Sequence, residues 1–273
     1  LDRMFPNNEK AGNSQRALPY CFSDIIIDDS DFVYTATDGT RKEQIKKLRP
    51  GDGRNILNSD DISFSDDQMN RTYIMGYDYT QRIIGLDVDE QGFIYCLDAS
   101  YGRIYVYDSK CRMITAFGGG MKTGTQKGMF VNAIAIAVQG SNVIAADSGN
   151  NLLTIFSRND FGNKVHNLVT QTLDGDYIAS KTGWEEVLAS DKNLQVAYNG
   201  LARSYLAENN YEKAMEIALQ GYDRETYSLA FEYYRSKWVS DNFAVLFTAA
   251  IVLLVCILAV VIFIKKKKFM IKN

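Results

Sequence analysis

The sequence predicts a multidomain fold, in which a partial all-β propeller is followed by α-helical repeats and one C-terminal transmembrane helix. Strand-like segments recur 49 positions apart within the first 157 residues, and helix-like segments recur 34 positions apart further along the chain. The third observation is an uncharged apolar run of 22 residues from Phe243 to Ile264. The composition, with 46% hydrophobic and 23% charged residues, is that of a folded chain.

The strand repeat is clearest between two segments that begin at Leu97 and Ala146. LDASYGRIYVYD and ADSGNNLLTIFS share an acidic residue, a small polar turn and an apolar strand. Another strand precedes each of them, at 85–96 and 135–146, and a more divergent copy occupies 23–39. Short strands separated by turn residues and repeated in blocks of about 40–50 predict the blades of a β-propeller.

The same segments resemble the NHL-repeat family. The resemblance rests on GLDVDEQGFIYCLDASYGRIYVYD, on GMFVNAIAIAVQGSNVIAADSGNNLLTIF and on the connector FGGG at Phe117–Gly120. It implies a propeller of roughly six blades, of which three are recognisable over residues 1–160, so we expect a fragment whose N-terminal blades are missing. Leu152, Ala133 and Gln139 depart from the family pattern, which puts any ligand site at those positions in doubt.

A helical pattern replaces the strands over residues 161–240. DGDYIASKTGWEEVL at 174–188 aligns with ENNYEKAMEIALQGY at 208–222, and the 34-residue spacing is the tetratricopeptide period. The segment resembles two tetratricopeptide repeats, with Tyr198 and Tyr205 on a first helix and Tyr211 on a second. The resemblance implies a partner-binding groove lined by these three tyrosines. The alternative is a rigid stalk that binds nothing.

The apolar run is long enough to cross a bilayer as one helix, and we assign residues 241–265 to this span. Phe243, Ile264 and the four lysines Lys265, Lys266, Lys267 and Lys268 are its predicted membrane anchor. Lysine excess marks the cytoplasmic side, so residues 266–273 form a cytoplasmic tail and the N-terminal domains are extracytoplasmic. The residues before the span carry 25 basic and 33 acidic side chains, a net charge of −8 that argues against nucleic acid as a partner.

No catalytic residue, cofactor or metal ligand is assigned from the sequence. DVDEQGFIYCLD at 87–98 nearly fits a calcium loop, but its flanking residues alternate as strands do. Propellers similar to NHL proteins include metal-dependent lactonases, which would place Asp89, Asp98, Asp147 and Asn132 in a central channel. The one histidine, His166, is interpreted as a surface or packing residue.

These patterns predict a membrane-anchored extracytoplasmic binding or scaffold protein with a protein or saccharide partner. The lipid bilayer is its other partner. The combined resemblance is to proteins of Gram-positive bacteria, some of whose relatives carry a Yip-type membrane domain with several helices. It implies an accessory role in carbohydrate uptake or in envelope assembly. The alternatives are a lactonase-like propeller enzyme and a purely structural tether.

Overall fold

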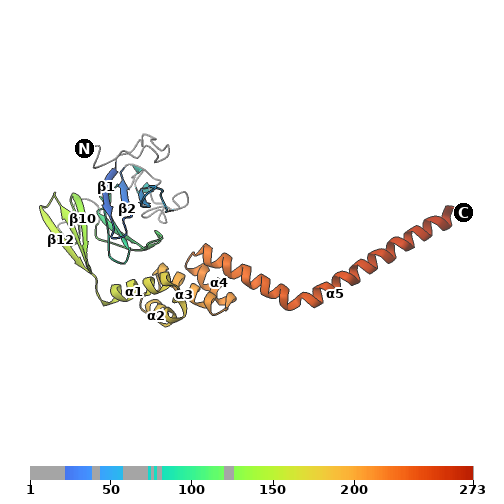
Figure 1. Cartoon of the computed structure of the whole chain (residues 1–273). Helices are drawn as coiled ribbons and strands as arrows, with labels where there is room; N and C mark the ends of the chain where they lie inside the picture. Colours follow the sequence, from blue (N-terminus) through green and yellow to red (C-terminus); the bar gives the residue numbers. More distant parts are fainter. Residues whose placement is uncertain are drawn as a thin grey trace. The chain divides into compact units, whose positions relative to one another are not determined.

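The computed structural model describes residues 22–38, 44–57, 73–74, 77–78, 82–119 and 126–272 (Figure 1). In this part of the chain twelve strands precede five helices. The chain divides into two compact units, Leu1–Thr170 and Gln171–Asn273. Residues 1–21 of the predicted first domain, Gly120 of the predicted connector and the side chains of Lys265–Lys268 lie outside the description.

The first unit contains three antiparallel sheets and a two-stranded ribbon, and in each of them the strand order follows the chain order. The first sheet comprises β1 (Phe22–Ile27), β2 (Val33–Thr37) and β3 (Ile45–Leu48), and the ribbon comprises β4 (Tyr73–Ile74) and β5 (Tyr77–Asp78). The second sheet comprises β6 (Ile83–Val88), β7 (Ile94–Asp98), β8 (Arg103–Tyr107) and β9 (Met113–Phe117). The third comprises β10 (Ala133–Gln139), β11 (Asn142–Asp147) and β12 (Leu152–Ser157).

One turn device, built on an aspartate, recurs in the first two sheets. Asp28, Asp89 and Asp108 each accept hydrogen bonds through Oδ1 from the backbone N–H groups two and four residues further along. Such a side chain satisfies the backbone groups of the turn, which the strands on either side cannot reach. Asp28, Asp89 and Asp108 are therefore structural parts of the hairpins.

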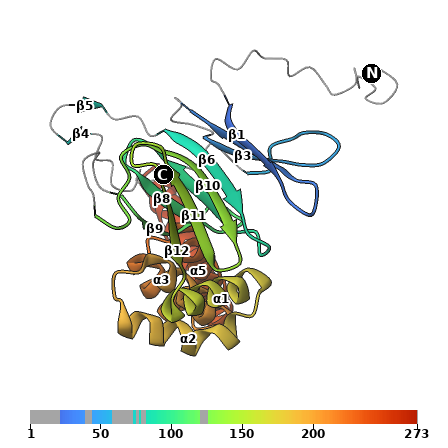
Figure 2. The ribbon, with the colours of Figure 1, turned by 90° about the vertical axis from the view of Figure 1, so that its left-hand side faces the viewer.

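Two carboxylates fix neighbouring sheets to one another. Asp24 of β1 accepts the backbone N–H of Leu86 at 2.9 Å, and Asp87 of β6 accepts the backbone N–H of Val138 at 2.6 Å. β6 consequently lies between β1 and β10, as the ribbon shows (Figure 2). The first two sheets enclose a common core of fully or nearly fully buried residues: Tyr34, Ala36, Ile45, Leu57, Ile83, Leu86, Ile94, Cys96, Tyr105, Tyr107 and Cys111.

The predicted all-β propeller is wrong. The strands that the structure describes form three separate small sheets and a ribbon, and they do not close into a ring; with the helices, the fold is mixed α and β. The physical reason is that the repeat specifies hairpins. Pairing between successive strands is local, whereas ring closure would need contacts between sheets far apart in sequence that the repeat pattern does not encode.

Helix α1 (Asp160–Asp174) is held to the second sheet by the histidine of the chain. His166 Nε2 lies 3.0 Å from Asp89 Oδ2, and its ring stacks on Phe93 at a centroid separation of 3.6 Å. His166 is only 5% exposed. The interpretation of His166 as a packing residue fits this position, and the same aspartate closes the β6–β7 turn.

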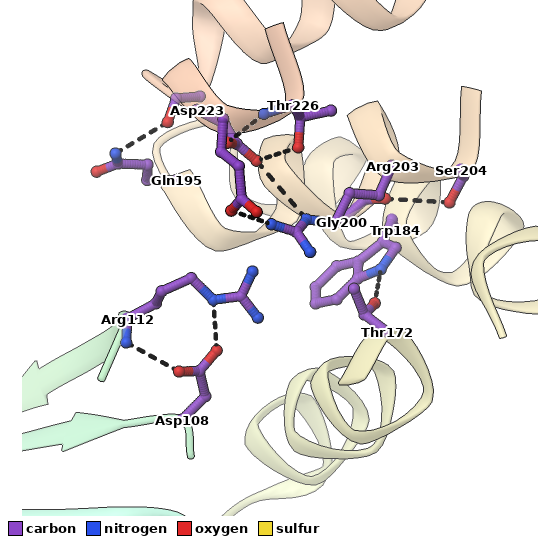
Figure 3. Close-up of polar contacts among 12 residues, drawn as sticks. Asp108, Arg112, Thr172, Trp184, Gln195, Gly200, Arg203, Ser204, Asp223 and Thr226 are labelled. Carbon is purple, nitrogen blue, oxygen red and sulfur yellow. Dashed lines mark hydrogen bonds and ion pairs between the residues drawn. The ribbon is translucent and has the colours of Figure 1, made fainter. Parts of the chain in front are cut away.

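The second unit is a series of packed helices. They are α2 (Tyr177–Ser190), α3 (Gln195–Ala207), α4 (Tyr211–Gln220) and α5 (Arg224–Lys272). Trp184 of α2 is fully buried, and its indole N–H donates to Thr172 Oγ1 at 3.1 Å (Figure 3). Gly200 of α3 faces this ring, and a side chain on residue 200 would overlap it. The absence of a Cβ therefore sets how closely α2 and α3 approach.

α5 is long and apolar enough to cross a membrane. Its apolar part is exposed, and the predicted anchor residues Phe243 and Ile264 are 60% and 49% exposed. Exposure of this apolar surface to water is unfavourable in free energy, whereas its contact with lipid is favourable.

Candidate ligand-binding groove between α4 and α5

A groove of about 390 Å³ lies where the start of α4 meets α5. We call it the α4–α5 groove. Two asparagines, three aromatic residues, two carboxylates and one lysine line it: Asn209, Asn210, Tyr211, Glu212, Tyr234, Lys237, Trp238 and Asp241. The volume lies within the range of small-molecule sites, whereas the lining is more polar than is usual for them, since five of the eight residues are polar or charged.

The loop before α4 forms one wall of the groove. Asn209 adopts a left-handed backbone conformation with φ of 60°, which asparagine tolerates better than most residues. Asn210 caps α4, because its side chain accepts the backbone N–H of Lys213. The Tyr211 hydroxyl donates to Asn209 Oδ1 at 2.9 Å, and its ring stacks on Tyr233 of α5. The orientation of the Tyr211 side chain is therefore fixed by contacts with the loop before α4 and with α5.

The opposite wall is one face of α5. Tyr234, Lys237, Trp238 and Asp241 have the spacing i, i+3, i+4 and i+7, which places them on one side of a helix. In the described part of the chain, no ion pair involves Lys237 or Asp241, and no hydrogen bond involves the indole N–H of Trp238 or the Tyr234 hydroxyl. These groups are consequently available to a ligand.

The start of α5 is tied to α3. Asp223 caps α5 by accepting hydrogen bonds from the backbone N–H and the hydroxyl of Thr226. Arg203 of α3 lies 3.7 Å from Asp223 (Figure 3). The same guanidinium lies 3.1 Å from Glu225. Because Arg203 and Asp223 are 12% and 8% exposed, this ion pair is shielded from water, which strengthens it relative to a surface pair.

The three tyrosines predicted to line one groove lie in different surroundings. Tyr211 lines the α4–α5 groove, whereas the Tyr198 hydroxyl donates to the carbonyl of Lys192. Lys181 Nζ lies 4.3 Å above the Tyr205 ring. The pKa of Lys181 is raised, first by its hydrogen bond to Glu208. Of these three tyrosines, only Tyr211 lines the α4–α5 groove.

The carboxylates considered for a metal site accept hydrogen bonds from backbone N–H groups instead. Asp98 Oδ1 accepts the N–H groups of Arg82 and Ser100, and Asp147 accepts those of Val131, Asn132 and Gly149. Within the described ranges, no group of three or more histidine, cysteine or acidic residues could hold a metal ion. Asp89, Asp98 and Asp147 each belong to a separate turn.

No protein-family model and no curated protein matches the chain. Among solved structures, it is similar to the computationally designed Ika4 protein, at 14% identity and a TM-score of 0.33, over 50% of this chain and 65% of that one. It is also similar to the computationally designed Ika8 protein, at 15% identity and a TM-score of 0.32, over 50% of this chain and 33% of that one.

The resemblances to NHL and tetratricopeptide repeats are therefore wrong as family assignments. No family model supports either of them, and the sheets do not close into a propeller. The 34-residue period has a local origin. α2 and α4 begin at Tyr177 and Tyr211, and the left-handed residues Gly175 and Asn209 precede these starts by the same two positions. A repeated helix start of this kind does not define a family.

Of the eight groove residues, only Tyr211 was predicted from the sequence as a site residue, and four of the other seven share one face of α5. These residues are Tyr234, Lys237, Trp238 and Asp241. Their helical spacing was visible in the sequence, but the meeting of this face with the loop before α4 was not.

Proposed function

We propose that the chain is a membrane-anchored binding protein that holds its folded units outside the cytoplasm and binds a saccharide or protein partner in the α4–α5 groove. The observation that carries the proposal is the continuity of α5. One helix, Arg224–Lys272, supplies a wall of the groove and then the whole apolar segment. A ligand in the groove would thereby be held close to the membrane surface.

The chemistry of the groove favours a saccharide among these partners. Aromatic rings offer flat apolar faces to the C–H face of a sugar ring, and Tyr211, Tyr234 and Trp238 supply three such rings. Sugar hydroxyls both donate and accept hydrogen bonds. The asparagine amides, the carboxylates of Glu212 and Asp241, and Lys237 match both roles.

Changing Tyr211 or Trp238 to alanine is expected to weaken saccharide binding by at least about tenfold, because each change removes an aromatic contact and the apolar area it buries. The measurement is titration of the detergent-solubilised full chain with a panel of soluble methyl glycosides, followed by calorimetry. Tyr205→Ala is the matched control, because Tyr205 is also a part-buried tyrosine of the helical unit but lies outside the groove.

Circular dichroism of all three variants would establish that the helices remain folded. Equal affinity in the Tyr211→Ala, Trp238→Ala and Tyr205→Ala variants would contradict the groove as the binding site. If the unaltered chain binds no glycoside, the saccharide partner is wrong and the proposed partner is a protein.

Orientation is a separate prediction, supported by the excess of lysine after the apolar segment. A specific protease site inserted in the exposed Gly140–Ser141 turn is expected to be cut when the protease is added outside intact cells that produce the chain. The same site added after Asn273 is expected to stay intact until the cells are opened. The reverse pattern would show that the folded units face the cytoplasm.

A further inference from the structure

Within the described ranges, no strand pairs with the outer edge of the third sheet. The strand order of this sheet is β10–β11–β12, which leaves β12 at the edge. Ser141 accepts the backbone N–H of Arg158, the residue after β12, so the hydrogen-bonded positions between β11 and β12 alternate from that pair. The backbone N–H and C=O groups of Leu153, Ile155 and Ser157 consequently point away from β11, toward the open edge.

The second sheet shows what such an edge accepts in this fold. β8 pairs with β7 in the register in which β12 pairs with β11, because Arg103 lies opposite Asp98 and Leu152 lies opposite Asp147. In the second sheet a fourth strand, β9, pairs antiparallel with the outer edge of β8. The equivalent edge of β12 is therefore able to accept one further antiparallel strand.

β12 lacks the features that usually prevent pairing between edge strands, which are charged side chains, especially lysine, and proline. β3, at an edge of the first sheet, carries Lys46 and Lys47, whereas β12 has the sequence LLTIFS. β9 is also uncharged, but its large side chains are buried or half-buried. Leu153 and Ile155 of β12 are 71% and 62% exposed. β12 is therefore an apolar edge that is open to another strand.

The sequence of β12 favours a second copy of the same strand as the occupant. Two copies of a strand can pair antiparallel across a twofold axis, so that the same surface is used on both chains. Because β12 has no charged residue, this pairing opposes no like charges, which would destabilise it. The register that places Leu153 opposite Ile155 of the second copy pairs two exposed aliphatic side chains on each side of the axis.

The same pairing would extend an apolar face of the third sheet. Leu153 lies opposite Ala146 and Ile155 lies opposite Ile144, so these four side chains share one face. A second copy would continue this face across the axis and cover the exposed flanks of Leu153 and Ile155. The contact is small, so we expect a reversible dimer that forms as the concentration of the chain rises.

We propose that the protein forms a twofold dimer in which β12 pairs antiparallel with β12 of a second copy, joining the two third sheets into one continuous sheet. The backbone N–H groups of Leu153 and Ile155 donate to carbonyl groups of the second copy. This dimer is separate from the α4–α5 groove, and the presence or absence of saccharide binding there does not bear on it.

The test compares the detergent-solubilised full chain at low and high protein concentration. Sedimentation velocity, corrected for bound detergent, gives the number of chains in each particle, and hydrogen exchange gives the protection of individual amides. We expect dimers at high concentration, in which the amides of Leu153 and Ile155 exchange at least about tenfold more slowly than in the monomer. Association through α5 would instead give dimers in which these two amides are unprotected.

Ile155→Lys is expected to weaken the dimer by at least about tenfold, because the two introduced charges would lie at neighbouring positions across the axis and repel each other. Ile25→Lys is the matched control, because Ile25 is a strand isoleucine with the same 62% exposure but belongs to β1. This control is expected to leave the dimer unchanged. Protection of the β10 and β11 amides would establish that the third sheet remains folded in both variants.

A chain that stays monomeric at every concentration would overturn the inference. So would a dimer in which the amides of Leu153 and Ile155 exchange freely, or a dimer that Ile155→Lys does not weaken more than Ile25→Lys does. Protection of the same two amides in the monomer would show that another segment of the chain covers the edge, and it would overturn the inference equally.

Discussion

Replacing Gly200 with alanine is expected to destabilise the helical unit by about 3 kcal/mol or more. The new Cβ would overlap the indole ring of Trp184, which is fully buried and is held by its hydrogen bond to Thr172. Overpacking of a core costs roughly 1–3 kcal/mol, and more where the neighbour cannot move. The free energy of unfolding of the full chain in detergent, measured by urea titration of the helical circular dichroism signal, gives the result.

Two further variants show whether the overlap is the cause. Ala207→Ser adds one heavy atom to the exposed end of the same helix and is expected to change the free energy of unfolding by less than about 0.5 kcal/mol. Trp184→Phe combined with Gly200→Ala is expected to be more stable than Gly200→Ala alone, because the smaller ring leaves room for the methyl group. A Gly200→Ala variant as stable as the parent chain would contradict this account of α2–α3 packing.

Replacing Asp147 with alanine is expected to destabilise the third sheet by about 3 kcal/mol. The carboxylate accepts the backbone N–H groups of Val131, Asn132 and Gly149 and the side-chain amide of Asn150. Asp147 is 3% exposed, whereas Val131, Asn132 and Gly149 are exposed residues, so water can replace part of the loss. A hydrogen bond to a charged group contributes about 1.5–3 kcal/mol, and the expected loss corresponds to one or two of the four bonds. The measurement is hydrogen exchange of the backbone amides of β10–β12, which reports the loss of stability in the third sheet itself.

Asp29→Ala is the matched control for Asp147→Ala. Asp29 is an exposed turn residue, and its carboxylate has no hydrogen-bond partner in the described part of the chain. Its removal is expected to change stability by less than about 0.5 kcal/mol. Equal protection of the β10–β12 amides in both variants would show that Asp147 does not hold the third sheet.

The same carboxylate gives the third sheet a pH dependence. Burial alone would raise the pKa of Asp147, but hydrogen bonds from the backbone N–H groups of Val131, Asn132 and Gly149 outweigh burial and lower it. A group whose pKa is lower in the folded state stabilises that state above its unfolded pKa, and this contribution is lost as the pH falls through the folded pKa. The amides of the third sheet in the parent chain should therefore lose protection from hydrogen exchange as the pH falls below ~4. The Asp147→Ala variant should not show this pH-dependent loss of protection.

Local structure was predictable where the determining residues are close in sequence. The alternation around Phe93 and Tyr95 indicated strands, and β7 is there. The arrangement of the sheets was not predictable, because it depends on bonds such as that from the Leu86 N–H to Asp24, which lie 62 positions apart. The contact between His166 and Asp89, 77 positions apart, was inaccessible for the same reason.

The candidate groove was predictable only in part. Tyr211 was identified because it lies in the second copy of the helical repeat, at 208–222, whereas Trp238 lies outside both copies. A repeat comparison emphasises positions that recur, and Trp238 has no equivalent in the first copy. The helical spacing of Tyr234, Trp238 and Asp241 defines one face of α5, but only the fold shows that this face meets the loop before α4.

The chain-order pairing of the strands has a consequence for biosynthesis. Each described sheet pairs only strands that are neighbours in sequence, so its formation requires the closure of short loops and proceeds rapidly. The strands also precede α5 in the chain, and synthesis proceeds from the N-terminus. The sheets can therefore acquire their hydrogen bonds while the ribosome is still making the apolar segment, which limits the time during which unpaired strand edges are exposed to aggregation.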